Sequence, residues 1–211
     1  PYGKRSFLTL RDGTKVWINS GTEVRFPVNM EGKERSIYVD GEIYIEVAKD
    51  KERPFYVHTS GFDVRVYGTK FNVTSYKADK EKSVVLVEGS VSVCSKEETK
   101  EKEAKEIFLH PDQMYHTTNR GPMITHVNAL QYITWKDGIW QFTSESLESI
   151  ALRLSRYYGV DIHCDEKTAV KSCTGKLILF DDVDKTLRII EEIFGVRYET
   201  NQNEIIISMN P

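Results

Sequence analysis

The chain has 211 residues, a formal net charge of −3 and 39% hydrophobic residues, which is enough for one large domain or two small ones. This charge balance excludes the basic footprint of a nucleic-acid-binding domain and a polybasic membrane patch. No apolar run approaches the roughly 20 residues of a transmembrane helix, and the opening PYGKRSF leads toward a strand rather than a signal peptide. Composition leaves open whether the chain is cytosolic or the soluble fragment of a larger protein.

Residues 1–127 predict an all-β domain. Two alternating runs in LTLRDGTKVWIN flank Asp12-Gly13, a hairpin signal because both positions tolerate positive φ. In SIYVDGEIYIEVA the apolar residues stay on odd positions across Gly41, which predicts one long strand that bends at the glycine. VVLVEGSVSV repeats this pattern around Gly89.

The stretch FDVRVYGTKFNVTSY, residues 62–76, changes its parity. Its apolar residues stand on even positions before Gly68-Thr69 and on odd positions after it. Side chains alternate along a strand, so an unbroken strand would turn its second apolar set to solvent. Two interpretations remain open: a β-bulge or tight corner that keeps both sets inward, or an ordinary loop between two strands.

Two segments without apolar periodicity follow. The run KEETKEKEAKE, 96–106, carries nearly balanced charges and predicts an exposed loop or hairpin tip before a short strand at 107–109. Residues 118–136, with Gly121-Pro122, are interpreted as the stretch that leads to a second domain. Because the all-β domain is taken to end at residue 127, the connection between the domains is assigned to 128–136.

Residues 137–211 predict a small α+β domain. Apolar residues at helical spacing in SLESIALRLSRYY and LRIIEEIF predict two helices, each ended by a glycine, Gly159 or Gly195, and followed by a strand. TGKLILF and EIIIS predict two more strands. The repeated helix–glycine–strand order indicates two similar αβ halves.

The sequence offers no motif for catalysis or metal binding. Its five histidines lack HxxxH or HExxH spacing, and there is no P-loop, GxGxxG or GxSxG. Asp181, Asp182 and Asp184 are interpreted as the start of the second helix, where negative charge is favourable, rather than as metal ligands. We therefore expect no enzyme activity, no cofactor and no metal.

The three cysteines lack zinc-ligand spacing. Cys94 fits a buried strand. Cys164 and Cys173 flank a short polar segment, so in an oxidising compartment they either form a disulfide or remain two ordinary cysteines near strand ends.

The order of motifs resembles the periplasmic part of FecR-type anti-sigma factors, especially those of Bacteroidetes. The matching residues are Leu10, Asp12-Gly13-Thr14, Val16-Trp17-Ile18-Asn19, Arg35, Gly41-Glu42, Tyr44, Glu46-Val47, Pro54-Phe55, Val57, Gly68-Thr69, Phe71-Asn72-Val73, Tyr76, Glu88-Gly89, Val91, Leu109, Pro111 and Gln113. The tail from Trp135 through Asp137-Gly138 and Phe142 is similar to the C-terminal domain of this family, which is itself similar to the short N-terminal domain of secretins and TonB-dependent transducers.

Three positions depart from the family pattern. Asp112 stands where the family usually has glycine, and aspartate tolerates the left-handed backbone that such a turn requires. Tyr67 and Ile45 replace the commoner leucine and phenylalanine, which changes packing but not the family.

The resemblance implies a relay. This chain would be the periplasmic, signal-receiving region of a single-pass inner-membrane anti-sigma factor. A transmembrane helix and a cytosolic region that holds an extracytoplasmic-function (ECF) sigma factor, both absent here, would precede it. The signalling domain of a ligand-bound outer-membrane TonB-dependent transducer would contact it. The alternative is a periplasmic glycan- or cell-wall-binding β-module that uses exposed tyrosine and tryptophan.

Two strands of the C-terminal domain are candidates for contact with the transducer, because an edge strand offers unpaired backbone groups to a partner strand. The candidate residues are Leu177, Ile178, Leu179, Phe180, Ile205, Ile206 and Ile207. Consecutive apolar residues favour burial on both faces for 205–207, whereas exposure is favoured for 177–180. Proline at Leu177 or Leu179, whichever N–H points outward, is expected to abolish binding without unfolding the protein.

Overall fold

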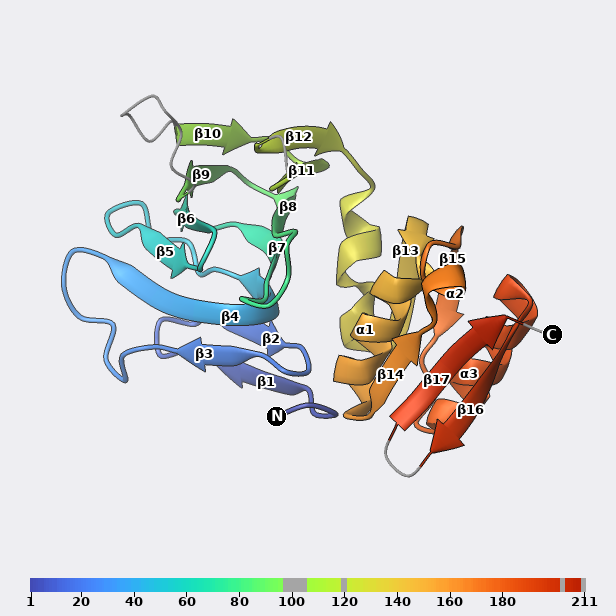
Figure 1. Ribbon diagram of the computed structural model, residues 1–211. Helices are drawn as coiled ribbons and strands as arrows, with labels where there is room; N and C mark the ends of the chain where they lie inside the picture. The colour runs from blue at the N-terminus through green and yellow to red at the C-terminus, as the bar shows by residue number, and fades with distance from the viewer. Residues whose placement is uncertain (97–105, 119–120, 202–203, 210–211) are drawn as a thin grey trace. The chain divides into compact units, whose positions relative to one another are not determined.

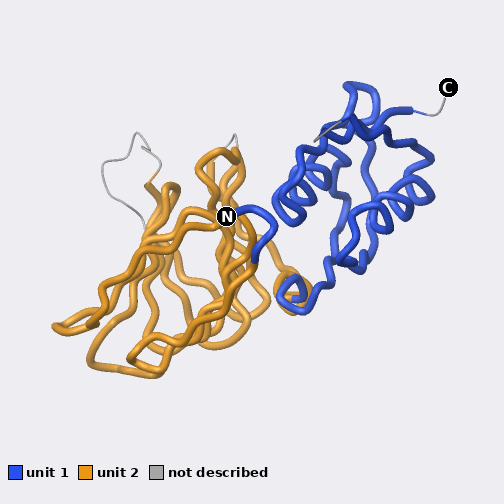
Figure 2. Tube along the Cα trace, turned by 90° about the horizontal axis from the view of Figure 1, so that it is seen from below, with its two compact units in different colours: residues 1–4, 134–211 blue, residues 5–133 orange. Residues whose placement is uncertain are grey.

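The computed structural model describes residues 1–96, 106–118, 121–201 and 204–209 (Figure 1). It contains two compact units, coloured separately in Figure 2. Arg5–Ile133 form the β unit, and Thr134–Pro211 together with Pro1–Lys4 form the C-terminal unit. Residues 97–105, most of the charged run expected as a loop, lie outside the described residues.

Strands of the β unit form two half-sheets joined through one long strand, β4 (Arg35–Glu46). Residues 35–40 of β4 pair in the first half-sheet and residues 41–46 in the second. The other strands of the first half-sheet are β3 (Glu23–Arg25), β5 (Phe55–His58), β6 (Phe62–Val66), β9 (Val91–Ser95) and β10 (Glu106–Leu109). Those of the second are β1 (Ser6–Thr9), β2 (Lys15–Ile18), β7 (Lys70–Ser75), β8 (Ser83–Glu88), β11 (Gln113–His116) and β12 (Met123–His126).

One apolar core lies between the half-sheets. It takes Val57, Phe62 and Val93 from the first and Phe71 and Tyr115 from the second, all of them fully buried. The rings of Phe62 and Tyr115 meet edge to face across the core, with centroids 5.4 Å apart, the geometry that aromatic quadrupoles prefer. The predicted β-rich fold of this half of the chain is confirmed.

Positive φ marks five places where the described chain passes from one half-sheet to the other. These residues are Gly21, Gly41, Gly68, Gly89 and Asp112. The predicted long strand with a bend at Gly41 is confirmed as β4. The same prediction is wrong for Gly89, because β8 ends before this glycine and β9 begins after it in the other half-sheet.

The parity change at Gly68 is a tight corner. Residues 67–69 connect β6 of the first half-sheet to β7 of the second, so both apolar sets face the same core. Gly68 has a φ of +143°, and a Cβ atom there would lie 2.8 Å from the Cα of Lys49. Both the backbone conformation and the close approach therefore require glycine.

Asp112 performs the role of a glycine between β10 and β11. Its φ is +61°, and its Oδ1 accepts a hydrogen bond from the backbone N–H of Ala129 at 3.1 Å. The expected turn is thus preserved.

The segment 118–136 is not only a connection. Strand β12 lies inside it, so that interpretation was wrong for Met123–His126. A 3₁₀ helix, η1, follows over Ala129–Asp137.

The C-terminal unit contains two long helices and two small sheets around one apolar core. The helices are α1 (Leu147–Tyr158) and α3 (Val183–Phe194), with a short α2 (Glu166–Ala169). One sheet pairs β13 (Ile139–Ser146) with β15 (Ser172–Ile178); the other has the order β14 (Asp161–Cys164), β17 (Glu204–Met209), β16 (Val196–Asn201). The predicted α+β class is confirmed, whereas β13 and α2 were not predicted.

Both long helices end at the predicted glycines, and α3 begins at the predicted aspartates. Ser146 caps α1 by accepting from the Ser149 N–H, and Asp182 caps α3 by accepting from the Asp184 N–H at 3.0 Å. Gly159 and Gly195 follow the helices with left-handed φ values of +72° and +61°. The aspartate cluster is therefore a helix start, as expected.

The first residues of the chain contact the end of α1. The N–H of Gly3 donates to the carbonyl oxygen of Arg156 at 3.0 Å. A Cβ at Gly3 would lie 3.0 Å from the carbonyl oxygen of Tyr158, so the two backbones are in close contact. This contact makes residues 1–4 part of the C-terminal unit.

Cys94, Cys164 and Cys173 are free thiols, so the disulfide that was one of two alternatives for Cys164 and Cys173 is not formed. The two residues lie on β14 and β15, strands of different sheets. Cys164 instead donates to the carbonyl oxygen of Leu147 at 3.6 Å. Burial raises the pKa of its thiol to about 11.

Candidate functional site

The first candidate site is the outer edge of β15. In the described part of the chain β15 pairs on one side only, with β13. Leu177 is 1% exposed and packs into the core, whereas the next residue, Ile178, is 54% exposed. The strand therefore has one buried face, one solvated face and one edge with unpaired backbone groups.

The hydrogen bonds show which amides face that edge. The N–H of Leu179 donates to the carbonyl oxygen of Gly138 at 2.9 Å, toward β13. Leu177 lies opposite Trp140 in the same register, and N–H directions alternate along a strand, so the Leu177 N–H also faces β13. The amides of Lys176 and Ile178 face away. Neither Leu177 nor Leu179 is thus the right position for the proline test.

The two residues after β15 are partly engaged. Leu179 packs against the core. Phe180 is 37% exposed, but its N–H points to the Thr186 hydroxyl at 3.4 Å and its carbonyl oxygen accepts from the Tyr158 hydroxyl at 2.8 Å. Burial raises the pKa of that tyrosine to about 12, so it stays a donor at neutral pH. The open edge consequently ends near Ile178.

The second group of candidate residues lies in the middle of a sheet. Strand β17 pairs with β14 on one side and β16 on the other. Ile205 and Ile207 are buried, and Ile206 is half-buried. Residues 205–207 therefore offer no free edge for strand addition.

Several motif residues of the β unit meet around one buried carboxylate. Glu42 is 4% exposed and accepts hydrogen bonds from the side chains of Asn19 at 2.7 Å, Asn72 at 3.1 Å and Thr74 at 3.2 Å. Glu42 lies on β4, Asn72 and Thr74 lie on β7, and Asn19 directly follows β2. All three of these neighbours donate to the carboxylate. The cluster satisfies a buried charge and ties three segments together.

A second buried cluster surrounds Arg35. This residue is 1% exposed, pairs with Asp12 at 2.8 Å and donates to the carbonyl oxygens of Ala48 and Arg53. Its guanidinium carbon also lies 5.3 Å from the centre of the Phe55 ring. The Asp12 carboxylate additionally accepts from the N–H and hydroxyl of Thr14, which fixes the hairpin to β4.

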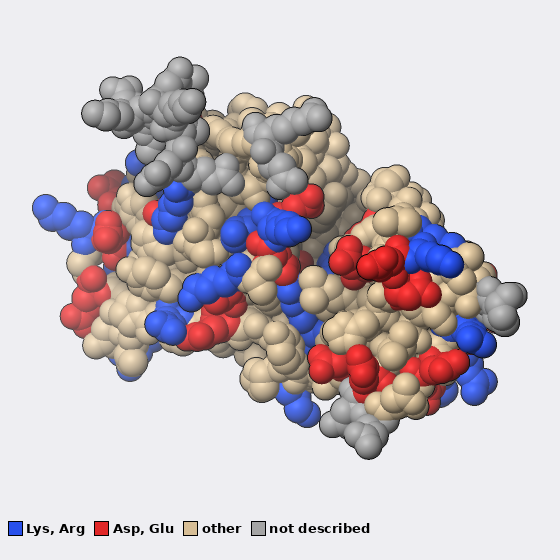
Figure 3. Space-filling model, viewed as in Figure 1, with Lys and Arg blue, Asp and Glu red and all other residues tan. Residues whose placement is uncertain are grey.

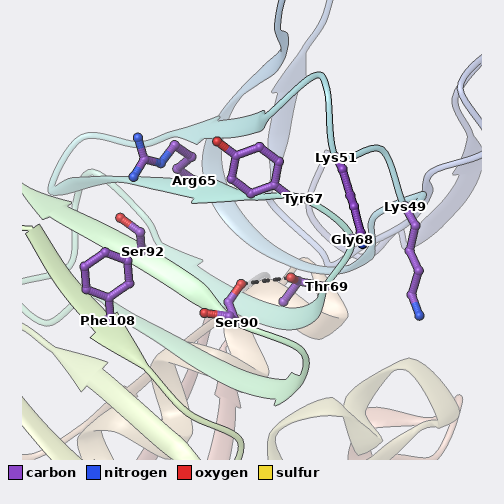
Figure 4. Close-up of a pocket in the computed structure, with 9 residues that line it drawn as sticks. All are labelled: Lys49, Lys51, Arg65, Tyr67, Gly68, Thr69, Ser90, Ser92 and Phe108. Atoms are coloured by element: carbon purple, nitrogen blue, oxygen red, sulfur yellow. Dashed lines mark hydrogen bonds between the residues drawn. The ribbon is translucent and has the colours of Figure 1, made fainter.

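The β unit also has an open pocket of about 360 Å³ (Figure 4). Its lining residues are Lys49, Lys51, Arg65, Tyr67, Gly68, Thr69, Ser90, Ser92 and Phe108. They come from the segment between β4 and β5, from the Gly68 corner, from the turn before β9, and from strands β6, β9 and β10. Sequence reasoning missed this pocket; the one signal was Tyr67, which replaces a leucine usual in the family.

Among the described residues, no three metal-ligating side chains come together, and none of the described helices has the length and apolar character needed to cross a membrane. Figure 3 shows groups of acidic side chains on the surface of the C-terminal unit. Asp182 and Asp184 of this unit stand at the start of α3.

In its described residues the chain thus combines a β unit, whose two half-sheets share one long strand, with a small α+β unit that has an open strand edge. Two family models match the chain: FecR protein over residues 2–92, and FecR, C-terminal over residues 139–207. The chain belongs to the FecR family and is the sensor region of a FecR-type anti-sigma factor.

Solved structures show the same architecture. Two crystal structures of a candidate anti-sigma factor from Parabacteroides distasonis ATCC 8503, at 1.65 and 2.50 Å resolution, match with TM-scores of 0.89 and 0.88. Each is 26% identical, and the match covers 100% of this chain and 97% or 96% of the other. No curated protein matches the chain.

Proposed function

We propose that this chain is the periplasmic receiver of a relay that runs from an outer-membrane TonB-dependent transducer to an ECF sigma factor. The observation that carries the proposal is the open edge of β15 in a unit of the family's C-terminal type. The region that holds the sigma factor and the inner-membrane anchor would belong to the rest of the anti-sigma factor.

Strand addition is the contact that this edge favours. The amides of Lys176 and Ile178 face outward, so a strand of the transducer's signalling domain would pair with them and gain affinity from the backbone. The exposed face beside the edge supplies side-chain specificity, with Ile178 directly opposite the half-buried Ile139 of β13. An apolar side chain of the partner would cover this cross-strand pair.

The N-terminal residues offer a route for the signal. The bond between Gly3 and Arg156 places residues 1–4 against α1, inside the unit that carries the open edge. In the anti-sigma factor, these residues would lead back toward the membrane anchor. Binding that shifts α1 would therefore act on the chain at its membrane side.

The test measures binding of the purified signalling domain of each TonB-dependent outer-membrane transducer from the same organism. Lys176→Pro and Ile178→Pro each remove an outward N–H without breaking a bond to β13, so both variants should stay folded and lose binding at least tenfold. Ile178→Ser keeps the N–H and should weaken binding less than Ile178→Pro.

Val170→Ser is the matched control, because Val170 is 78% exposed in the same unit but lies outside β15. It should bind like the unmodified chain. Full binding by folded Lys176→Pro and Ile178→Pro would remove the β15 edge from the proposal. The outer edge of β13 would then be the next surface to test.

A further inference from the structure

We propose that the pocket beside the Gly68 corner binds an anionic sugar, a pyranose that carries a carboxylate. The pocket lies wholly in the β unit, whereas the relay site proposed above lies in the C-terminal unit. The two proposals therefore stand or fall separately.

Charge selects the class of ligand. Three of the nine lining residues are basic and none is acidic. Among the described residues Lys51 pairs with no carboxylate, and Arg65 uses one terminal nitrogen, Nη2, on Glu106, with its side chain 36% exposed. A guanidinium has five donors in a planar fork, so Arg65 retains donors for a ligand carboxylate while Glu106 holds it in place.

The aromatic rings select the shape of the ligand. Tyr67 is 46% exposed and Phe108 is 57% exposed, although both belong to a unit with a well-filled core. Figure 4 shows Tyr67 beside Arg65, with Ser92 and Phe108 on neighbouring strands. Flat, exposed rings next to hydroxyl and cationic groups match a sugar, which has an apolar C–H face and a polar rim.

The floor of the pocket is rigid. The Thr69 hydroxyl donates to the carbonyl oxygen of Ser90 at 2.9 Å, which joins the Gly68 corner to the segment before β9. The Ser92 hydroxyl bonds to the same Glu106 oxygen that pairs with Arg65. A volume of about 360 Å³ lies at the small end of ligand pockets, and the open pocket suits one or two rings of a longer oligosaccharide.

The test is calorimetric titration of the purified chain with trigalacturonate and, as the neutral match, galactotriose. The charged sugar should bind and the neutral sugar should bind at least tenfold more weakly. Tyr67→Leu introduces the residue usual in the family and Phe108→Leu shortens an exposed side chain, so both should stay folded. Each, like Arg65→Gln, should weaken trigalacturonate binding at least fivefold.

Two control variants lie outside the pocket. Phe26→Ala removes an aromatic side chain that is 40% exposed, and Arg25→Gln removes an exposed arginine that pairs with Glu23. Both should bind trigalacturonate like the unmodified chain. The proposal fails if trigalacturonate does not bind, if galactotriose binds equally well, if a tetraglutamate peptide binds as tightly, or if Tyr67→Leu and Phe108→Leu bind normally.

Discussion

The β unit and the C-terminal unit satisfy their polar groups in different ways. The β unit buries charged side chains, such as Glu42 and Arg35, inside networks that join distant strands. The C-terminal unit buries mainly apolar side chains, with Arg156, Thr168 and Thr186 as exceptions, and several of its polar bonds lie at helix ends. The difference separates a scaffold, whose recognisable motifs specify structure, from a unit whose exposed strand edge is available for contact.

The largest expected effect is on the buried ion pair of the β unit. Arg35→Ala leaves the Asp12 carboxylate, whose side chain is 6% exposed, without its cation. Breaking such a pair typically costs about 3–5 kcal/mol. Arg25→Ala is the control, because its pair with Glu23 is exposed to solvent and exposed pairs contribute little to stability. Urea unfolding measures both, and equal losses would contradict the scaffold role of Arg35.

A somewhat smaller loss is expected at the Gly68 corner. Gly68→Val places a Cβ in a backbone conformation that side chains rarely adopt and 2.8 Å from the Cα of Lys49. We expect a loss of more than about 2 kcal/mol in the free energy of unfolding. Gly32→Val shares the positive φ, at +104°, but its Cβ would have no atom within 4 Å. It should lose less, and a loss as large as that of Gly68→Val would show that crowding by Lys49 contributes nothing.

A modest loss of stability is expected when the N-terminal cap of α1 is removed. Ser146→Ala removes the acceptor for the Ser149 N–H at the start of α1, and loss of such a cap costs about 1 kcal/mol. Ser146→Asp keeps an acceptor and should restore most of that stability. Thermal unfolding followed by helix-sensitive circular dichroism provides the measurement. An unchanged midpoint in Ser146→Ala would mean that α1 is held by packing alone.

The smallest effect is a change in reactivity without a change in stability. Because burial raises the pKa of Cys164 from 9.0 to about 11, its thiolate fraction at pH 8 falls about 100-fold, and the thiolate is the reactive form. Iodoacetamide should therefore label Cys164 slowly at pH 8 in the folded protein, and faster as the pH rises toward 11. Peptide mass spectrometry after timed labelling checks this rate. Rapid labelling at pH 8 would contradict the burial of this thiol.

The sequence predicted the features that depend on neighbours along the chain. The alternation of apolar residues predicted the bend at Gly41, and the glycines after both long helices predicted where those helices end. It missed β13, because a bulge between Phe142 and Glu145 and a left-handed Ser144 interrupt the alternation. It also missed α2, which is only four residues long.

The candidate site was predictable only in part, because it depends on residues that are distant in the sequence. Sequence located the apolar segment 177–180, of which residues 177 and 178 belong to β15, but not which amides face outward, since that depends on the register with β13. The pocket was missed because its walls come from residues as far apart as Lys49 and Phe108, which share no local pattern. Such assembled surfaces require the fold.

The most direct test of the relay is residue-resolved amide exchange, by nuclear magnetic resonance, with and without the transducer's signalling domain. In the free chain, the outward amides of Lys176 and Ile178 should exchange rapidly, while the inward amide of Leu177 is protected by β13. Binding should slow exchange at Lys176 and Ile178 and leave Leu177 nearly unchanged, because strand addition engages only the open edge. Unchanged exchange at both outward amides in a saturated complex would contradict the account.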